Sequence, residues 1–383
     1  MKWVFWLSAA VISYAYVGYL IWLWLRAQWR PCPAQRGFCQ KLVSVVMVVR
    51  NEEAVLARKV SNLLALDYPG NDFQVVVVSD GSTDSTESIL REFARNPHVH
   101  VLLNQLPGGK AAGLNAGMTA AQGDIVVFTD ARQEIETEAI RLLVENFADP
   151  EVGAVSGELM LGDPASGETG RGMGLYWQIE KRVRELEAAT GSVVGATGAI
   201  YAVRRDLVVE VPPDTILDDV FIPMHVARQG FRVLFDERAR AWDRPDLGTQ
   251  REFRRKVRTL TGNYQLVQLA PWLLRKENPL RFEFISHKLL RLVVPFALLA
   301  ALVAAALAPG SFYRVAFWAQ IGIYALGLLG FAGWNLGPLS RLSNVAYTLV
   351  ALNAAALLAF VNLVTGHKTV WMSAPLRKEV RLG

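Results

Sequence analysis

The sequence is poor in the residues that build disulfide frameworks and zinc sites. It has two cysteines, Cys32 and Cys39, and five histidines among 383 residues. A disulfide framework needs more cysteines, and no His/Cys cluster has the spacing of a zinc site. The two cysteines flank a linker beside an apolar segment. Between acylation and an inert thiol, we favour an inert thiol.

Several nucleotide-binding and hydrolase signatures are also missing. The stretch Gly108-Gly109-Lys110 is followed by alanine and lacks the spacing of a phosphate-binding P-loop. No dinucleotide-binding glycine fingerprint follows a predicted strand, and no Gly-x-Ser-x-Gly nucleophile elbow is present. These absences argue against P-loop enzymes, dinucleotide-dependent oxidoreductases and serine hydrolases.

Charge is absent from the start of the chain. Residues 3–25 contain no charged side chain, and tryptophans lie near both ends of this run at Trp3, Trp6, Trp22 and Trp24. A transmembrane helix needs about 20 apolar residues, and aromatic side chains concentrate at the membrane interfaces. We therefore predict a transmembrane helix within residues 1–30. A cleavable signal peptide fits less well, because the run is long and no small-x-small cleavage site follows it.

Apolar runs return near the C-terminus. Residues 289–308, 312–334 and 345–365 predict three transmembrane helices within 289–366, and the last two are rich in glycine and alanine. Between them and the first helix lies a charged segment, for which we predict a cytosolic domain over 42–250. Residues 251–288 are expected to form interfacial amphipathic helices, and 367–383 a basic tail. The alternative for the basic helix is a solvated face packed on the domain.

Lysine and arginine predict the orientation of a multi-pass protein of the cell membrane. Basic residues follow the first span and precede the second, so both clusters border the central segment. Because such residues mark the cytoplasmic side, we place that segment in the cytosol. The tail disagrees, because three further spans would put its basic residues outside. Either the rule fails for the tail or one span is re-entrant.

The central segment alternates predicted strands and helices. Val43–Val49, Val75–Val78 and Ile125–Phe128 are short apolar runs of the kind found in strands that are buried on both faces. The alternation predicts an α/β fold with a doubly wound, mostly parallel sheet. Ligands bind such sheets at the carboxyl ends of the strands. Three strand ends there present Asn51 to Glu53, Asp80 and Asp130.

The second half of the segment is less regular. Leu175 to Thr190 predicts an amphipathic helix, and Tyr201 to Val203 predicts a strand. Glycines at 191, 195 and 198 between them indicate tight turns. Asp218 and Asp219 precede a second amphipathic stretch, where they are either a helix N-cap pair or part of a site.

In combination, these motifs resemble those of a known family. Arg50-Asn51-Glu52-Glu53, Ser79 to Asp84, Gly109-Lys110 with Leu114-Asn115, Asp130-Ala131-Arg132 and Asp218-Asp219 occur in the order found in membrane-integrated family 2 glycosyltransferases. That group includes poly-N-acetylglucosamine, chitin-oligosaccharide, hyaluronan and cellulose synthases. The resemblance covers about residues 42–275 and the layout of spans. It implies the A-type glycosyltransferase fold and inverting transfer from a UDP-sugar.

The resemblance also implies roles for individual residues. It places Asn51, Glu52, Glu53, Asp80 and Ser82 in the nucleotide site, with Asp80 on the uracil, and Lys110 and Arg132 beside the donor diphosphate. Asp130 would hold Mg²⁺ or Mn²⁺. Asp219, beside Asp218, would take the proton of the acceptor hydroxyl. Gly198, Arg255 and Arg258 would lie on the acceptor or product side.

Two departures from the family pattern bear on function. Arg132 replaces the second acid of the metal motif Asp-x-Asp, so either Asp130 holds the metal alone or Arg132 supplies part of the positive charge. Processive members carry Gln-x-x-Arg-Trp, whereas this chain has Arg255 to Thr259 with neither Gln nor Trp. This favours single or short transfer to a lipid or lipid-linked acceptor over polymerisation.

The expected partners are a UDP-sugar, a lipid or glycan acceptor and the bilayer. No nucleic-acid partner is expected, and a homo-oligomer is compatible with the sequence. Two alternatives stay open. One is a processive β-polysaccharide synthase that also translocates its product. The other is a non-catalytic sugar-nucleotide-binding membrane protein.

Overall fold

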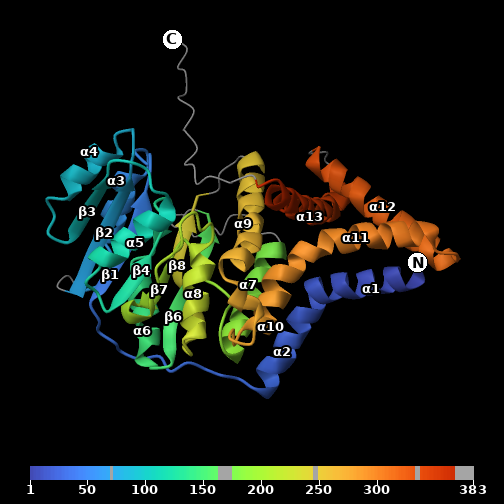
Figure 1. The fold of residues 1–383 in the computed structure, drawn as a ribbon, viewed down its shortest axis with the longest axis horizontal. Coiled ribbons are helices and arrows are strands. Elements are labelled where there is room, and N and C mark those ends of the chain that lie inside the picture. Colours follow the sequence, from blue (N-terminus) through green and yellow to red (C-terminus); the bar gives the residue numbers. More distant parts are fainter. Residues whose placement is uncertain (70–71, 163–174, 245–248, 333–336, 367–383) are drawn as a thin grey trace, which may run out of the picture. The chain divides into compact units, whose positions relative to one another are not determined.

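The structure, a computed structural model, describes residues 1–69, 72–162, 175–244, 249–332 and 337–366 (Figure 1). The chain divides into two compact units. The helical unit combines Met1–Pro33, Thr169–Val194 and Pro245–Thr369. The sheet unit combines Ala34–Glu168 and Gly195–Arg244. The chain therefore passes between the units more than once.

The sheet unit is built on one mixed sheet of eight strands in the order β3-β2-β1-β4-β7-β6-β8-β5. Pairings β1–β2, β2–β3, β1–β4 and β6–β8 are parallel, and β4–β7, β6–β7 and β5–β8 are antiparallel. The strands are β1 (Val43–Val49), β2 (Phe73–Asp80), β3 (Val99–Asn104), β4 (Ile125–Phe128), β5 (Glu134–Ile135), β6 (Val152–Leu161), β7 (Tyr201–Arg204) and β8 (Arg232–Asp243).

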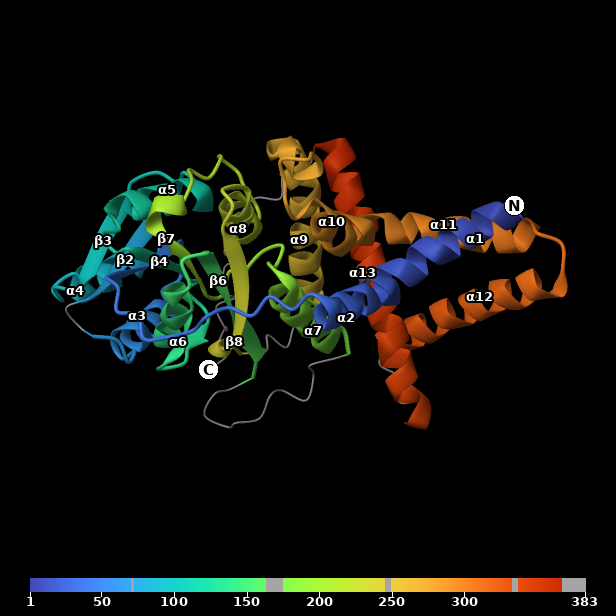
Figure 2. The ribbon, with the colours of Figure 1, turned by 90° about the horizontal axis from the view of Figure 1, so that it is seen from below.

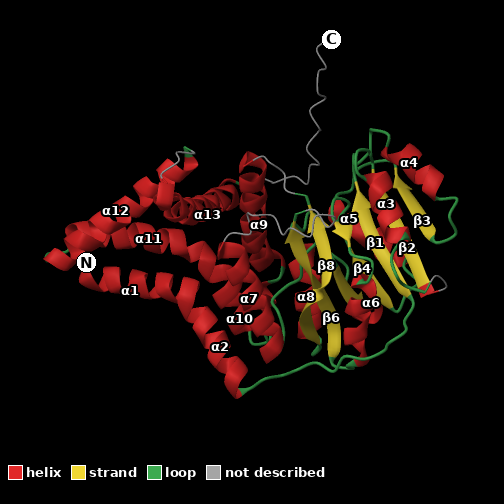
Figure 3. Ribbon diagram, turned by 180° about the vertical axis from the view of Figure 1, so that it is seen from behind, coloured by secondary structure: helices red, strands yellow, loops and turns green. Residues whose placement is uncertain are grey.

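Helices cover both faces of this sheet, which explains why its central strands are continuous apolar runs. The valines of β2 at positions 75–78 are all fully buried. In Figure 2, α5 (Lys110–Ala120) and α8 (Asp218–Arg228) lie on one face, and α3 (Leu56–Leu64) and α6 (Ala139–Glu145) lie on the other. The helix α4 (Thr86–Phe93) follows β2. Figure 3 shows the strands between these helical layers.

Two glycines set the distance between α5 and the sheet. A Cβ atom at Gly117 would lie 2.5 Å from Val46 Cγ1, and one at Gly113 would lie 2.5 Å from Val48 Cγ1. No side chain fits at that distance, so α5 packs directly on β1. This close packing fixes the N-terminus of α5, where Lys110 stands.

The helical unit contains four helices long and apolar enough to cross a membrane: Lys2–Trp29, Arg281–Leu307, Ser311–Phe331 and Ser340–Thr365. The first comprises α1 (Lys2–Ser13), the π-helical turn η1 (Tyr14–Gly18) and α2 (Tyr19–Trp29). The second comprises α10 (Arg281–Phe284), a second π-helical turn η7 (Ile285–Leu289) and α11 (Leu290–Leu307). The third and fourth are α12 (Ser311–Phe331) and α13 (Ser340–Thr365), joined by the short η8 (Gly337–Leu339).

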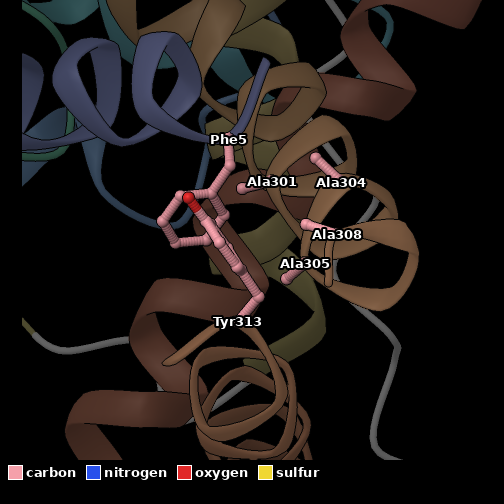
Figure 4. Close-up of a cluster of buried hydrophobic side chains, with 6 residues drawn as sticks. All are labelled: Phe5, Ala301, Ala304, Ala305, Ala308 and Tyr313. Atoms are coloured by element: carbon pink, nitrogen blue, oxygen red, sulfur yellow. The ribbon is translucent and has the colours of Figure 1, made fainter. Parts of the chain in front are cut away.

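The first two of these helices pack side by side (Figures 1 and 2). Near the N-terminus, Phe5 and Tyr313 pack against a row of small residues at the end of α11, as Figure 4 shows: Ala301, Ala304 and Ala305 on the helix and Ala308 at its C-cap. At the level of the π-helical turns, the hydroxyls of Tyr14 and Ser286 lie 3.0 Å apart. Small residues let helices approach closely, which is the usual way in which membrane helices associate.

Helix α7 (Leu175–Thr190) belongs to the helical unit although it interrupts the sheet unit in sequence. Its Val183 and Leu186 pack against Tyr19 and Leu23 of α2. The helical unit also contains α9 (Thr249–Leu269) and the 3₁₀ turn η6 (Pro271–Leu274).

A buried polar network joins α7 to the spans. Imidazole nitrogens of His287 lie 2.8 Å from Glu187 Oε1 and 3.1 Å from Glu180 Oε1, and Arg291 lies 2.7 Å from Glu180 Oε2. The hydroxyl of Tyr19 donates to Glu187 Oε1 at 2.7 Å. Both carboxylates therefore have hydrogen-bonded or ion-paired partners, as buried charges require.

The α/β prediction with helices at both ends is confirmed, and the matching elements agree closely with their predicted limits. The predicted domain limits at 42–250, 251–288 and 289–366 stay predictions. Residues 169–194, which lie inside the first of these ranges, belong to the helical unit. The predicted basic tail, 367–383, lies outside the described residues. Neither Cys32 nor Cys39 forms a disulfide among the described residues.

Candidate functional site

The turns that follow β1 and β2 are tied to one another by hydrogen bonds. Asn51 has a left-handed backbone with a φ of 53°, and its Oδ1 accepts the N–H of Thr83 at 2.8 Å. Its own N–H donates to Ser82 Oγ at 3.2 Å. Asparagine tolerates this conformation better than most residues, which explains its place here. The predicted nucleotide-site residues Asn51 and Ser82 therefore lie together.

Glu52 and Glu53 add further hydrogen bonds between the same two turns. The N–H of Glu52 donates to Thr86 Oγ1 at 2.9 Å, and Glu53 Oε2 accepts the N–H of Ser85 at 2.9 Å. Burial raises the pKa of Glu52, and Arg132 opposes that shift while Asp130 adds to it. Glu52 therefore lies in the electrostatic field of the segment that follows β4.

Asp80 is fully buried and holds a loop. Its two carboxylate oxygens accept the N–H groups of Gly108 at 2.7 Å and Gly109 at 3.0 Å. Gly81 permits this arrangement, because its φ is +62° and a Cβ there would lie 2.7 Å from the nitrogen of Pro107. Asp80 thus fixes the loop that leads into Lys110, and its predicted contact with uracil stays a prediction.

Lys110 connects two of the predicted acids. Its Nζ lies 3.1 Å from Asp130 Oδ1 and 3.1 Å from Asp218 Oδ1. The side chain of Asp130 is 39% exposed, whereas that of Asp218 is 5% exposed. Burial opposes the charge of Lys110, but Asp130, Asp218 and Asp219 outweigh it and raise the pKa of the ammonium. The site therefore holds a permanent cation that neutralises the buried acid and leaves Asp130 accessible.

Asp219 lies next to Asp130 across Gly198. The N–H of Gly198 donates to Asp219 Oδ2 at 3.1 Å. A Cβ at position 198 would lie 3.4 Å from Asp130 Oδ2 and 3.5 Å from Asp219 Oδ2. Helix α8 begins at Asp218, and its N-cap residue Leu217 makes no side-chain capping bond, so the two acids are not an N-cap pair.

Three strand ends and the starts of two helices, α5 and α8, therefore bring the predicted residues to one edge of the sheet. Strands β2 and β3 lie on one side of β1 and β4 lies on the other, so the chain reverses direction across the sheet between β1 and β4. Such a switch point forms a crevice outside the strand ends. Arg132 is exposed beside it. Arg255 and Arg258 lie on α9, which belongs to the helical unit, whereas the residues of this cluster belong to the sheet unit.

Two buried residues at this edge were not predicted. Tyr201, on β7, pairs with Phe128 and is fully buried, and its hydroxyl has no hydrogen-bond partner among the described residues. Burial, together with Asp218, Asp219 and Asp130, raises the pKa of Tyr201 well above its ordinary value. Lys59, on α3, is 2% exposed. Neither stands in a motif, so the sequence carried no signal for them.

The donor set fits a divalent ion that takes most of its ligands from a substrate. Among the described residues, no group of three or more His, Cys, Asp or Glu could hold a metal by itself. Asp130 Oδ2 faces the space left open by Gly198, while Asp130 Oδ1 is paired with Lys110. Mg²⁺ is commonly held by one or two carboxylates and the phosphates of the substrate. A single protein carboxylate is compatible with that mode.

Comparison with known proteins identifies the domain. Residues 44–211 match the family model for glycosyl transferase family 2. The chain carries a family 2 glycosyltransferase domain. The match contains the strand-end residues Asn51 to Glu53, Asp80 and Asp130, together with Lys110 and Gly198, and ends before Asp218.

Two relatives are named for different products, a glycolipid and a polysaccharide. The chain is 30% identical over 197 residues to a beta-monoglucosyldiacylglycerol synthase of Synechocystis, an alignment that covers 50% of this chain and 41% of the relative. It is 25% identical over 205 residues to a poly-beta-1,6-N-acetyl-D-glucosamine synthase of Staphylococcus aureus, covering 52% of this chain and 49% of that one. The matched region thus spans less than half the length of these relatives.

A solved structure shares the fold along nearly the whole chain. It is a mannosyltransferase from Pyrobaculum calidifontis in complex with GDP-Man and Mn²⁺, with a TM-score of 0.74 at 21% identity. The match covers 95% of this chain and 99% of that one. The predicted A-type glycosyltransferase fold is thereby confirmed, and the four apolar helices indicate association with a membrane.

Proposed function

We propose that this protein is an inverting membrane glycosyltransferase that moves a sugar from a UDP-sugar to a lipid, lipid-linked or glycan acceptor at the cytosolic face, forming a β-linkage. The observation that carries the proposal is the cluster in which Lys110 bridges Asp130 and Asp218 while Asp219 lies beside Asp130. It combines a cation for a leaving group with a carboxylate for an acceptor.

The leaving group sets the first requirement. When the bond from the sugar C1 to the diphosphate breaks, negative charge develops on the diphosphate, and positioned cations stabilise it. Lys110 is held at this site by two carboxylates, and Arg132 is exposed in the loop that contains Asp130. Mg²⁺ or Mn²⁺ held by Asp130 would add Lewis-acid stabilisation of the diphosphate.

The acceptor sets the second requirement. A hydroxyl is a weak nucleophile, so a base must accept its proton during attack. Asp219 is half-buried, and its Oδ2 is oriented by the N–H of Gly198. Asp218 is buried and paired with Lys110, which leaves Asp219 as the acid available to the acceptor. Direct attack by the hydroxyl on C1, opposite the leaving diphosphate, inverts the anomeric centre.

The relatives support lipid and glycan acceptors. One is named for a glucosyl transfer to diacylglycerol and the other for synthesis of a polysaccharide. The segment Arg255 to Thr259 lacks the Gln and Trp of processive enzymes, which favours a single transfer to a lipid. Processive synthesis with export of the product is the second candidate, favoured by the polysaccharide synthase relative.

The donor and the topology complete the proposal. The family resemblance favours UDP, whereas the structure with the same fold binds GDP-Man, so both nucleotides belong in the test. Basic residues that flank the central segment favour a multi-pass protein with that segment in the cytosol, where nucleotide sugars are made. An assembly of several copies stays compatible with this reading.

The test is nucleotide release by the purified chain in lipid nanodiscs. A panel of UDP- and GDP-sugars is supplied with diacylglycerol or membrane lipids, and products are read by mass spectrometry. Asp219→Asn should lower kcat by roughly 10²–10⁴-fold, as expected for loss of a general base. Asp206→Asn, an exposed acid in the same unit, should stay within about twofold, because surface polar groups rarely matter.

The competing outcomes are separable. Tight nucleotide-sugar binding without release of nucleotide would favour the non-catalytic sugar-nucleotide-binding protein. A ladder of products would favour the processive synthase. Wild-type activity in Asp219→Asn would refute the assignment of the base.

A further inference from the structure

A buried lysine underlies the two loops that carry the acids. Lys59 stands on α3, is 2% exposed, and donates from Nζ to Thr129 Oγ1 at 2.9 Å and to the carbonyl of Gln133 at 2.7 Å. These two acceptors bracket the segment that contains Asp130. Both are neutral, although buried lysines are seldom found without a charged partner.

The hydrogen bonds continue to the second loop. The hydroxyl of Thr129 donates to the carbonyl of Ala199 at 2.8 Å. Ala199 follows Gly198, whose N–H holds Asp219 Oδ2 at 3.1 Å. The N–H of Ala196, in the same loop, donates to the carbonyl of Asp219 at 2.7 Å. Hydrogen bonds therefore connect Lys59 through Thr129 to Ala199, and the backbone connects Ala199 to Gly198, which holds Asp219.

Helix α3 is hydrogen-bonded to the segment after β4 at a third point. One turn beyond Lys59, the side chain of Asn62 donates to the carbonyl of Ile135 at 2.9 Å and accepts its N–H at 2.8 Å. Residues three apart lie on one face of a helix. The face of α3 that carries Lys59 and Asn62 is thus hydrogen-bonded to the segment 129–135.

Core packing alone does not account for this lysine. A methionine of similar length would fill the position without burying an amine, but it would leave the Thr129 hydroxyl and the Gln133 carbonyl without this donor. Burial lowers the pKa of Lys59 to about 7, because the position disfavours an ammonium. A buried amine whose two hydrogen bonds both go to one loop fits a demand on the geometry of that loop.

We propose that Lys59 is a positioning residue that fixes the spacing between Asp130 and Asp219. Its amine holds both ends of the Asp130 loop and, through the hydroxyl of Thr129, anchors the loop that orients Asp219. The inference rests on the proposed function, because the spacing matters for transfer only if both acids act on one donor–acceptor pair.

The residues predicted to bind the nucleotide are held by a separate set of hydrogen bonds. Asn51, Ser82 and Thr83 hold one another, and Glu53 holds Ser85, through bonds that do not involve Lys59. Loss of Lys59 should therefore leave the KM for the donor nearly unchanged and lower kcat. A displacement of about 1 Å in such a site can reduce the rate by about 10²-fold.

The experiment compares four variants in nanodiscs at a temperature where all remain folded. Lys59→Met and Thr129→Val each break the path, and both should lower kcat about 10- to 100-fold with the donor KM within about threefold. Thr129→Ser keeps the hydroxyl and should restore most of the rate. Because both changes break the same path, the double variant Lys59→Met/Thr129→Val should be little worse than either single one.

Ser44→Ala is the matched control. Ser44 is also fully buried and polar, and its Oγ accepts the N–H of Gly123 at 2.8 Å and donates to Gln74 at 2.7 Å, at the opposite end of β1. It should lower the melting temperature without a comparable loss of kcat. A kcat in Lys59→Met within twofold of wild type, or an equal loss in Ser44→Ala, would overturn the inference.

Hydrogen exchange separates this inference from the proposed function. If the wild type transfers no sugar, the proposed function fails. The positioning role is then decided by amide exchange in Lys59→Met. Faster exchange in both segments 129–135 and 195–200, with the turn at 82–86 unchanged, supports it. Unchanged exchange in either segment refutes it.

Discussion

At the scale of single residues, Lys110 has the most demanding position. It is the first residue of α5, where the helix N-terminus already favours negative charge, and it adds a full cation between Asp130 and Asp218. One ammonium thus pairs with the buried carboxylate of Asp218 and offers a charge to an incoming diphosphate. These two tasks explain why an uncharged substitute cannot serve.

Lys110→Met should lower kcat by about 10²-fold or more, comparable to the loss of one positioned donor to a developing anion. It should also destabilise the fold, because the buried carboxylate of Asp218 would lose its ion-pair partner. Lys110→Arg keeps the charge and should retain more activity than the methionine variant. Steady-state kinetics with the preferred donor provide the measurement, and equal rates in the two variants would contradict a role for the charge.

Metal removal tests the single carboxylate of the metal motif. If Asp130 and the diphosphate share a divalent ion, EDTA should abolish transfer, and added Mn²⁺ or Mg²⁺ should restore it. Asp130→Ala should then lose turnover at any metal concentration. Full activity in EDTA would instead assign the neutralising role to Lys110 and Arg132. The assay is nucleotide release across a metal titration.

The acids were predictable as strand-end residues, and some of their partners were not. Asp80 and Asp130 follow valine-rich or isoleucine-led runs, so the sequence alone brings them to one sheet edge. That Asp80 holds the N–H groups of Gly108 and Gly109 depends on a loop 28 residues away, which no local pattern encodes. The bond from Lys59 to Thr129 crosses 70 residues and was equally hidden.

At the scale of elements, α7 is held by charge as well as by apolar contacts. Its Glu180 and Glu187 face His287, while Arg291 lies against Glu180. The pKa of Glu180 is held well below its ordinary value because Arg291 and the other nearby basic groups outweigh burial, which acts in the opposite direction. The basic groups around Glu180 therefore favour its charged form, and that form depends on these partners.

Glu180→Gln should reduce stability by about 3–5 kcal/mol, because it leaves the Arg291 guanidinium without its buried counter-charge. Arg182→Gln is the matched change on the same helix. Arg182 is 55% exposed and forms an ion pair with Glu185 of the same helix, so its loss should cost less than about 1 kcal/mol. Thermal unfolding in detergent compares the two. Equal midpoints would show that the network contributes little.

The elements that the sequence revealed are those with strong local signals. The valine runs and the amphipathic stretch at 175–190 were predicted within a few residues of their limits. Strands β6 and β8 were missed. β8 carries charged residues through much of its length, and the β6–β8 pairing contains two register irregularities, so neither strand shows a clean alternation. Their pairing with distant strands stabilises them, which local propensity cannot show.

At the scale of the whole molecule, the two units are interleaved in sequence. The sheet unit is completed only after the chain has contributed α7 to the helical unit. A soluble domain cut at the predicted limits would therefore carry α7 without α2, so that Val183 and Leu186 would be exposed together with two buried carboxylates.

A fragment of residues 34–244 should consequently associate or precipitate in the absence of detergent, because α7 would present an apolar face to water. Replacing Ile179, Val183 and Leu186 by glutamine in the same fragment should recover a monomer. Size-exclusion chromatography with light scattering distinguishes the two forms. A monomeric unmodified fragment would show that α7 finds another cover within the sheet unit.

The π-helical turns η1 and η7 have a further consequence. Each inserts one surplus residue into a span, and the two turns meet where Tyr14 faces Ser286. Removing one residue from Tyr14–Gly18 would rewind the turn and rotate everything before it by about 100°. Phe5 would then swing away from the alanine row of α11. The contacts between the two helices therefore depend on both π-helical turns. A residue removed from one turn would have to be matched by a residue removed from the other to keep these contacts.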